Sequence, residues 1–103
     1  MSQELSLRAA VVTWLARNGP RLGLRETRRS DGDASTLKAH FGLETTRHLI
    51  SITAWEHPPA LDVDALDRQS LEAEIVVAGP CADLDGAISK LDQFARWLEA
   101  RTV

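Results

Sequence analysis

The chain has 103 residues, of which 44% are hydrophobic and 26% charged, and this mix excludes wholesale disorder. A single cysteine excludes an internal disulfide framework and a zinc site built from cysteines. The formal net charge of −3 argues against a general nucleic-acid binder. The length suits one domain with one hydrophobic core, which we place over residues 1–103.

Residues 2–18 are predicted to form an amphipathic helix. Its apolar residues recur at spacings of three and four and fall on one stripe, which consists of Leu7, Ala10, Val11, Trp14 and Leu15. Gly19 and Pro20 follow, and this pair is typical of the position where a helix stops. We therefore expect the helix to end at Asn18.

Five β-strands are predicted next, because apolar and polar residues alternate with a period of two. The predicted strands cover residues 22–29, 36–41, 50–55, 61–65 and 71–77. An Asp-Gly pair at residues 31–32 suits a hairpin turn, and residues 44–47 and 67–70 form polar connections. Residues 57–59, His-Pro-Pro, interrupt the pattern after the third strand, since proline cannot donate to a sheet ladder.

Residues 84–98 are predicted to form the last element, a second amphipathic helix with Asp83 as its N-cap. Its apolar stripe consists of Leu84, Ala87, Ile88, Leu91, Phe94, Ala95 and Leu98. Short polar connections favour an antiparallel meander, and strands that alternate cleanly have one buried face. The predicted fold is therefore a two-layer α+β domain, in which a five-stranded antiparallel meander carries both helices on one face.

The other face of this sheet is expected to be exposed and charged. If the strands pair in sequence order, its residues are Arg25, Thr27, Arg29, Thr36, Lys38, His40, Ser51, Thr53, Trp55, Asp62, Asp64, Glu72 and Glu74. Residues 1–51 carry eight Lys or Arg and five Asp or Glu, a net charge of +3, whereas residues 52–103 carry four and ten, a net charge of −6. One side of the face is then basic and the other acidic, with Trp55 between them.

Two interpretations of this face are open. It is either a solvated surface whose opposite charges support the pairing of neighbouring strands, or a protein-binding surface. In the second case Trp55 is the apolar anchor, and the charges set specificity and association rate.

No arrangement of catalytic or metal-binding residues stands out. The three histidines lack the spacings of zinc motifs. Cys81 is expected to pack at the start of the last helix, although a thiol near a helix N-terminus can also have a lowered pKa and react. Carboxylates such as Asp62 and Asp64 can hold a divalent cation, but nothing in the sequence supplies a pocket for one. We therefore expect no enzyme activity, no cofactor and no metal site.

Residues 48–98 combine several features in a fixed order. A strand ends in Trp55 (residues 50–56, ISITAWE), and after a short turn an alternating acidic strand ends in Leu-Asp (residues 61–67, LDVDALD). A short strand and an amphipathic C-terminal helix follow. This order resembles that of the bacterial immunity proteins called TriTu. The turns at residues 57–59 and 67–70 lack the glycines of that family's pattern.

The resemblance implies a cytoplasmic antidote, encoded beside a polymorphic or contact-dependent toxin, that binds the toxic domain and blocks its active site without doing chemistry. Toxin domains that attack nucleic acids are often basic, so an acidic surface suits such a partner. The residues expected to contact the toxin are Thr53, Trp55, Asp62, Asp64, Glu72 and Glu74.

The alternative is a self-associating, homodimeric domain of structural or adaptor role. A face that is basic on one side and acidic on the other complements itself about a two-fold axis. No apolar run approaches the length of a membrane span and no signal peptide is evident, so we expect a cytoplasmic location without membrane contact.

Overall fold

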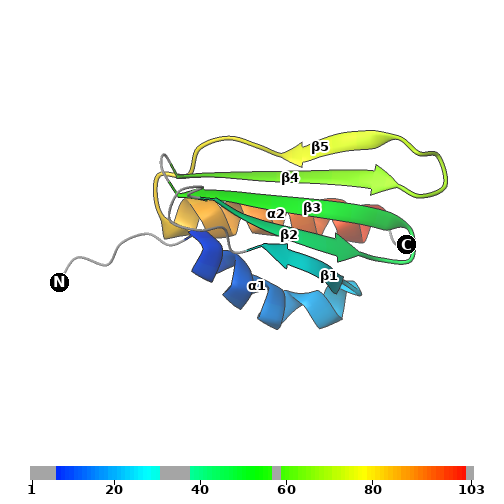
Figure 1. The fold of residues 1–103 in the computed structure, drawn as a ribbon, viewed down its shortest axis with the longest axis horizontal. Helices are drawn as coiled ribbons and strands as arrows, with labels where there is room; N and C mark the ends of the chain where they lie inside the picture. The colour runs from blue at the N-terminus through cyan, green and yellow to red at the C-terminus, as the bar shows by residue number, and fades with distance from the viewer. Residues whose placement is uncertain (1–6, 31–37, 57–58, 102–103) are drawn as a thin grey trace.

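The computed structural model describes residues 7–30, 38–56 and 59–101. Its elements are α1 (Leu7–Leu22), β1 (Arg25–Ser30), β2 (Lys38–Glu44), β3 (His48–Glu56), β4 (Pro59–Asp67), β5 (Ala73–Val77) and α2 (Leu84–Arg101). The strands form one antiparallel sheet in the order β1-β2-β3-β4-β5, and both helices lie on one face of it (Figure 1). The predicted α+β meander is therefore confirmed. The predicted helix start at Ser2, the Asp-Gly turn and Thr36 lie outside the described residues.

The core lies between the sheet and the two helices. Strands β2, β3 and β4 alternate between buried and accessible residues, as the two-residue period predicts. The largest fully buried side chains come from both layers, and they are Phe41, Ile52, Leu61 and Val63 from the strands and Leu7, Val11, Leu91, Phe94 and Leu98 from the helices. Because successive side chains of a strand point to opposite faces, the same alternation points every second residue away from the helices.

Helix α1 continues beyond its predicted end. Gly19 and Pro20 lie inside the helix, which ends at Leu22. Gly23 has a φ of 70°, and its N–H donates to the carbonyl of Pro20 (3.3 Å) while the N–H of Leu24 donates to the carbonyl of Gly19 (2.9 Å). These two bonds form the Schellman arrangement that terminates helices. The predicted stop was wrong because Gly23, rather than Gly19, adopts the left-handed conformation.

Strand β1 is an exposed edge strand whose alternation departs from the prediction. A bulge between Glu26 and Arg28 shifts its pairing with β2. Arg29 lies opposite the buried Phe41, and its guanidinium carbon is 5.3 Å from the centre of that ring, so Arg29 belongs to the helix face. The prediction that Arg29 faces outward was wrong, because one inserted residue moves those after it to the other face. Arg25 keeps its predicted place on the outer face.

Strand β5 is shorter than predicted, and most of its residues point to the face of the sheet opposite to the one predicted. It begins after Leu71, which lies in the preceding turn with a φ of 62° and a side chain that is 74% exposed. Ile75 lies opposite Asp64 on the outer face, whereas Glu74 lies on the helix face. A bulge near the end of the strand returns Val77 to the core. The prediction that Glu74 faces outward was therefore wrong.

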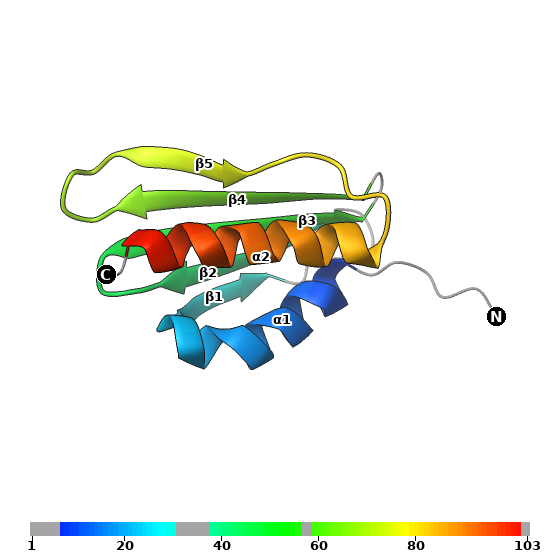
Figure 2. The ribbon, with the colours of Figure 1, turned by 180° about the vertical axis from the view of Figure 1, so that it is seen from behind.

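Helix α2 begins directly after Asp83, as predicted. The Oδ1 atom of Asp83 accepts a hydrogen bond from the N–H of Gly86 at 2.8 Å, which is N-cap geometry. The predicted stripe packs into the core from Ala87 to Leu98, whereas Leu84 is 51% exposed. Figure 2 shows α2 in front of β3 and running along it, with the tip of the β4–β5 hairpin projecting beyond the C-terminal end of α2.

Candidate functional site

The sheet face opposite the helices, which we call the open face, is the first candidate site. Its described side chains include those of Arg25, Arg28, Lys38, His40, Glu44, Leu49, Ser51, Thr53, Trp55, Asp62, Asp64, Leu66 and Ile75, with Thr27 at the bulge above Gly42. Four of the six predicted contact residues are neighbours here. Thr53 pairs with Asp62 across β3 and β4, and Trp55 and Asp64 lie one step to either side.

Trp55 is held in place by a neighbour on each side. Its side chain is 37% exposed, its Nε1 donates to Oδ2 of Asp62 at 3.2 Å, and Nζ of Lys38 lies 4.9 Å from its ring centre. A hydrogen bond and a cation–π contact together restrict the ring. The outward orientation predicted for Trp55 is confirmed, and the indole is an apolar surface fixed before any partner binds.

Exposed apolar side chains extend the open face beyond the predicted residues. Leu49 is 41% exposed and pairs with Leu66, and Ile75 is 70% exposed. Leu49 falls in the same alternation as Trp55, so the sequence pattern held a signal for it that our prediction missed. No such signal marks Ile75, because the change of register in β5 decides its face.

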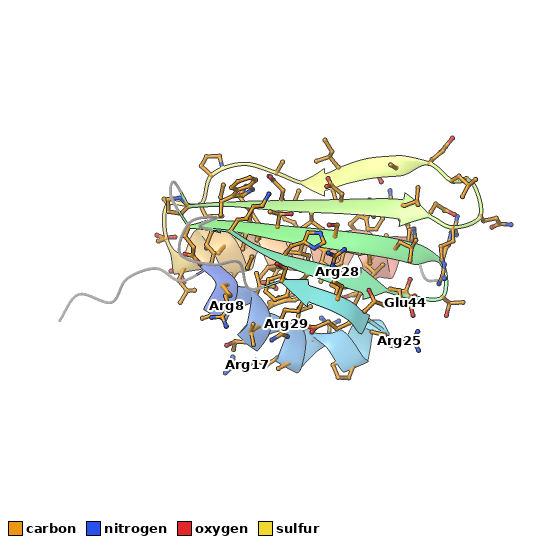
Figure 3. The ribbon with its side chains drawn as sticks, viewed as in Figure 1. Arg8, Arg17, Arg25, Arg28, Arg29 and Glu44 are labelled. Carbon is orange, nitrogen blue, oxygen red and sulfur yellow. The ribbon has the colours of Figure 1, made fainter. Side chains whose placement is uncertain are left out.

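Opposite charges occupy opposite sides of the open face. Arg25 and Arg28 lie on β1 (Figure 3). Asp62 and Asp64 lie on β4. Arg25 contacts the carboxylate of Glu44 on β2, which neutralises part of the basic side. The open face is therefore basic at the edge strand β1 and acidic at β4.

A pocket of about 360 Å³ lies on the helix side, between the end of α2 and the β4–β5 hairpin, and we call it the hairpin pocket. It is lined by His48, Ala65, Asp67, Ser70, Glu72, Ala73, Glu74, Trp97 and Arg101. The predicted contact residues Glu72 and Glu74 thus line this pocket and are separate from the open face. Nε1 of Trp97 donates to Oε2 of Glu74 at 2.9 Å, and the guanidinium carbon of Arg101 lies 4.2 Å from the centre of the Trp97 ring.

His48 is the most deeply buried polar residue of the hairpin pocket. Its side chain is 3% exposed, and its Nε2 is 4.0 Å from Oδ2 of Asp67. The centre of its ring lies 5.2 Å from the centre of the Trp97 ring, in an edge-on arrangement. Burial lowers the pKa of His48 from 6.5 despite the nearby Asp67 carboxylate, so the ring is neutral at pH 7. Its Nδ1 has no hydrogen-bond partner within the described residues.

Acidification is expected to destabilise the protein through His48. The pKa of His48 is lower in the folded chain, so the unfolded chain takes up a proton first, and the free energy of unfolding falls as the pH falls below about 6.5. Urea unfolding at about pH 7.5 and about pH 5.5 measures this loss. The His48→Phe variant, which cannot titrate there, is expected to lose less, and an equal loss in both proteins would contradict the prediction.

Cys81 belongs to the core. Its side chain is buried, its N–H donates to the carbonyl of Pro59 at 2.9 Å, and burial raises the pKa of its thiol. The lowered pKa that a helix N-terminus can produce is therefore not found, and the expected packing role is confirmed.

Within the described ranges, no group of three or more His, Cys, Asp or Glu side chains is arranged to hold a metal ion. In the same part of the chain, neither helix combines the length and the apolar character needed to cross a membrane.

The described residues form a small α+β fold with an open sheet face and a pocket at the β4–β5 hairpin. Comparison with known protein families, with curated proteins and with solved structures gave no match for this chain.

Proposed function

We propose that this protein is a non-catalytic, cytoplasmic immunity protein of the TriTu type, which neutralises a bacterial toxin domain by binding it through the open face. The resemblance of residues 48–98 suggests the class of partner. The observation that carries the proposal is Trp55, an exposed indole that Asp62 and Lys38 hold in place on the sheet face away from the helices.

An exposed and restrained tryptophan favours a binding surface over a merely solvated one. Tryptophan is enriched among the few residues that supply most of the energy of protein–protein interfaces. A ring that is already ordered loses little conformational entropy when a partner covers it. Leu49 and Ile75 add exposed apolar area on the same face, which suits a partner with an apolar patch.

The carboxylates on the same face as Trp55 favour a basic partner. Asp62 and Asp64 lie side by side on β4, and Asp64 is exposed and lies between Ser51 and Ile75 on the neighbouring strands. Carboxylates at the rim of an interface attract a basic partner over a distance and raise the association rate more than the final affinity. A nucleic-acid-degrading toxin domain has the charge that this arrangement attracts.

Co-expression with the toxin domain encoded beside this protein tests the proposal. We expect growth to be restored and the purified pair to sediment as one complex. A neighbouring toxin domain that remains fully active, with no complex formed, would overturn the proposal, as would a gene neighbourhood of metabolic enzymes alone.

Self-association is the second candidate function, and the charge layout of the open face favours it. Turning a second copy about an axis parallel to β3 places its β4 carboxylates over the β1 and β2 cations of the first copy. Sedimentation of the protein alone at low and high salt distinguishes the two functions. A dimer that dissociates in high salt supports self-association. A protein that is monomeric at both salt concentrations contradicts it.

A further inference from the structure

Strand β5 pairs with a neighbour on one side only. It stands at the end of the strand order, next to β4, and Figure 1 shows it along one edge of the sheet. The N–H of Asp67 donates to the carbonyl of Glu72 at 2.9 Å, so the ladder between β4 and β5 starts from a hydrogen-bonded pair. Bonded and non-bonded pairs alternate in an antiparallel ladder. Glu74 therefore directs its backbone groups to β4, whereas Ala73 and Ile75 direct theirs away from the sheet.

The outward backbone groups of β5 are available to a further strand. In the described part of the chain, no hydrogen bond from outside the sheet engages the backbone of Ala73 or Ile75. The bulge of β5 comes after Ile75, so both residues belong to the regular part of the strand. Unpaired N–H and carbonyl groups in a row are a template for another extended segment, and such strand addition is a common mode of protein recognition.

The opposite edge of the sheet is protected against such pairing. Strand β1 carries Arg25, Arg28 and Arg29, and a bulge lies between Glu26 and Arg28. Charged side chains and bulges are devices that prevent strand addition at an edge. Strand β5, with the sequence AEIVV, has a single charged residue, and its Ile75 is 70% exposed. Of the two edges, β5 is therefore the one suited to strand addition.

The charge of β5 disfavours a second copy of this chain as the added strand. Two copies use all the outward groups only when Ala73 of one copy lies opposite Ile75 of the other. That register places the exposed Glu74 directly opposite Glu74 of the second copy. Like charges directly opposite each other destabilise a pair of strands, whereas opposite charges stabilise it. A segment with lysine or arginine at this position is therefore the better partner.

We propose that β5 pairs antiparallel with an extended segment of the toxin domain, which places apolar residues opposite Ala73 and Ile75 and a lysine or arginine opposite Glu74. Ile75 lies opposite Asp64 on the open face, so this edge continues the proposed binding surface. Leu71, in the turn before β5, is 74% exposed and adds apolar surface beside the start of the strand. The identity of the partner rests on the proposed function, whereas the pairing chemistry of the edge is independent of it.

NMR titration with the peptide Ac-Thr-Val-Lys-Val-Thr-NH2 tests the edge without any toxin. Its valines can lie opposite Ala73 and Ile75, with the lysine opposite Glu74, and we expect the amide signals of Ala73 and Ile75 to shift. N-methylation of both valine nitrogens removes the N–H groups that face β5, and it is expected to weaken binding at least about fivefold. N-methylation of the lysine nitrogen, which faces away from β5, is expected to leave binding unchanged. No shift, or equal binding of all three peptides, would overturn the proposal.

Hydrogen exchange in the complex with the toxin domain separates this proposal from the proposed function. We expect the amides of Ala73 and Ile75 to exchange about tenfold or more slowly in the complex, and the amides of the other edge strand, β1, to keep their rates. If the toxin domain binds but the amides of Ala73 and Ile75 keep their rates, only the pairing at β5 fails. If the peptides bind in the expected order but no toxin domain does, only the proposed function fails.

Discussion

Replacing Trp14 by alanine is expected to lower the free energy of unfolding by about 3–5 kcal/mol. Trp14 on α1 is 3% exposed, and its ring centre lies 6.0 Å from that of Phe94 on α2. Its Nε1 donates to Oδ1 of Asp92 at 3.1 Å. The substitution leaves a cavity between the helices and the sheet and removes a hydrogen bond between α1 and α2, so two destabilising effects add.

Urea denaturation followed by circular dichroism measures this loss, and the melting temperature is expected to fall by more than about 10 °C. Trp14→Phe is the control, because it keeps an aromatic ring in the core and is expected to lose less stability. A loss below about 1 kcal/mol in Trp14→Ala would show that Trp14 does not hold the two helices together.

Replacing Trp55 by alanine is expected to weaken binding of the toxin domain and to leave the free energy of unfolding nearly unchanged. The toxin domain should bind about 2 kcal/mol more weakly, which is roughly thirtyfold in Kd, because an exposed anchor residue is lost from the open face. The free energy of unfolding should change by less than about 1 kcal/mol, because this ring is 37% exposed and its hydrogen bond to Asp62 lies at the surface.

Isothermal titration calorimetry with the toxin domain, together with urea denaturation, measures both quantities. Leu84→Ala is the matched control, since Leu84 is an exposed apolar residue on α2, away from the open face. It is expected to bind the toxin like the wild type. If Trp55→Ala binds the toxin with wild-type affinity, Trp55 is not part of the interface. If the variant is unfolded, Trp55 is needed for folding.

The central strands could be predicted because their pattern is local. Phe41 on β2, Ile52 on β3 and Val63 on β4 all occupy the buried phase of a two-residue alternation, and all three are fully buried. The outward residues Trp55 and Asp62 follow from the same alternation. Successive side chains of a strand must point to opposite faces, so a correct period assigns both faces at once.

The edge strands could not be predicted in the same way. The bulges in β1 and β5 each shift the register, and the sequence carries no mark for them. Arg29 and Glu74 were therefore assigned to the wrong face, and Ile75, which is 70% exposed, was missing from the outward residues that the alternation predicted. Edge strands are paired on one side only and bury little area, so their alternation is weakly constrained.

The sequence by itself determined the α+β class, the order of the elements and the outward position of Trp55, because local periodicity decides these features. Only the tertiary structure decided which acidic residues act together. Asp62 and Asp64 share the open face with Trp55, whereas Glu72 and Glu74 line the hairpin pocket with His48. That grouping depends on a register shift in β5 and on the packing of α2 against the sheet, and both are interactions between residues distant in the chain.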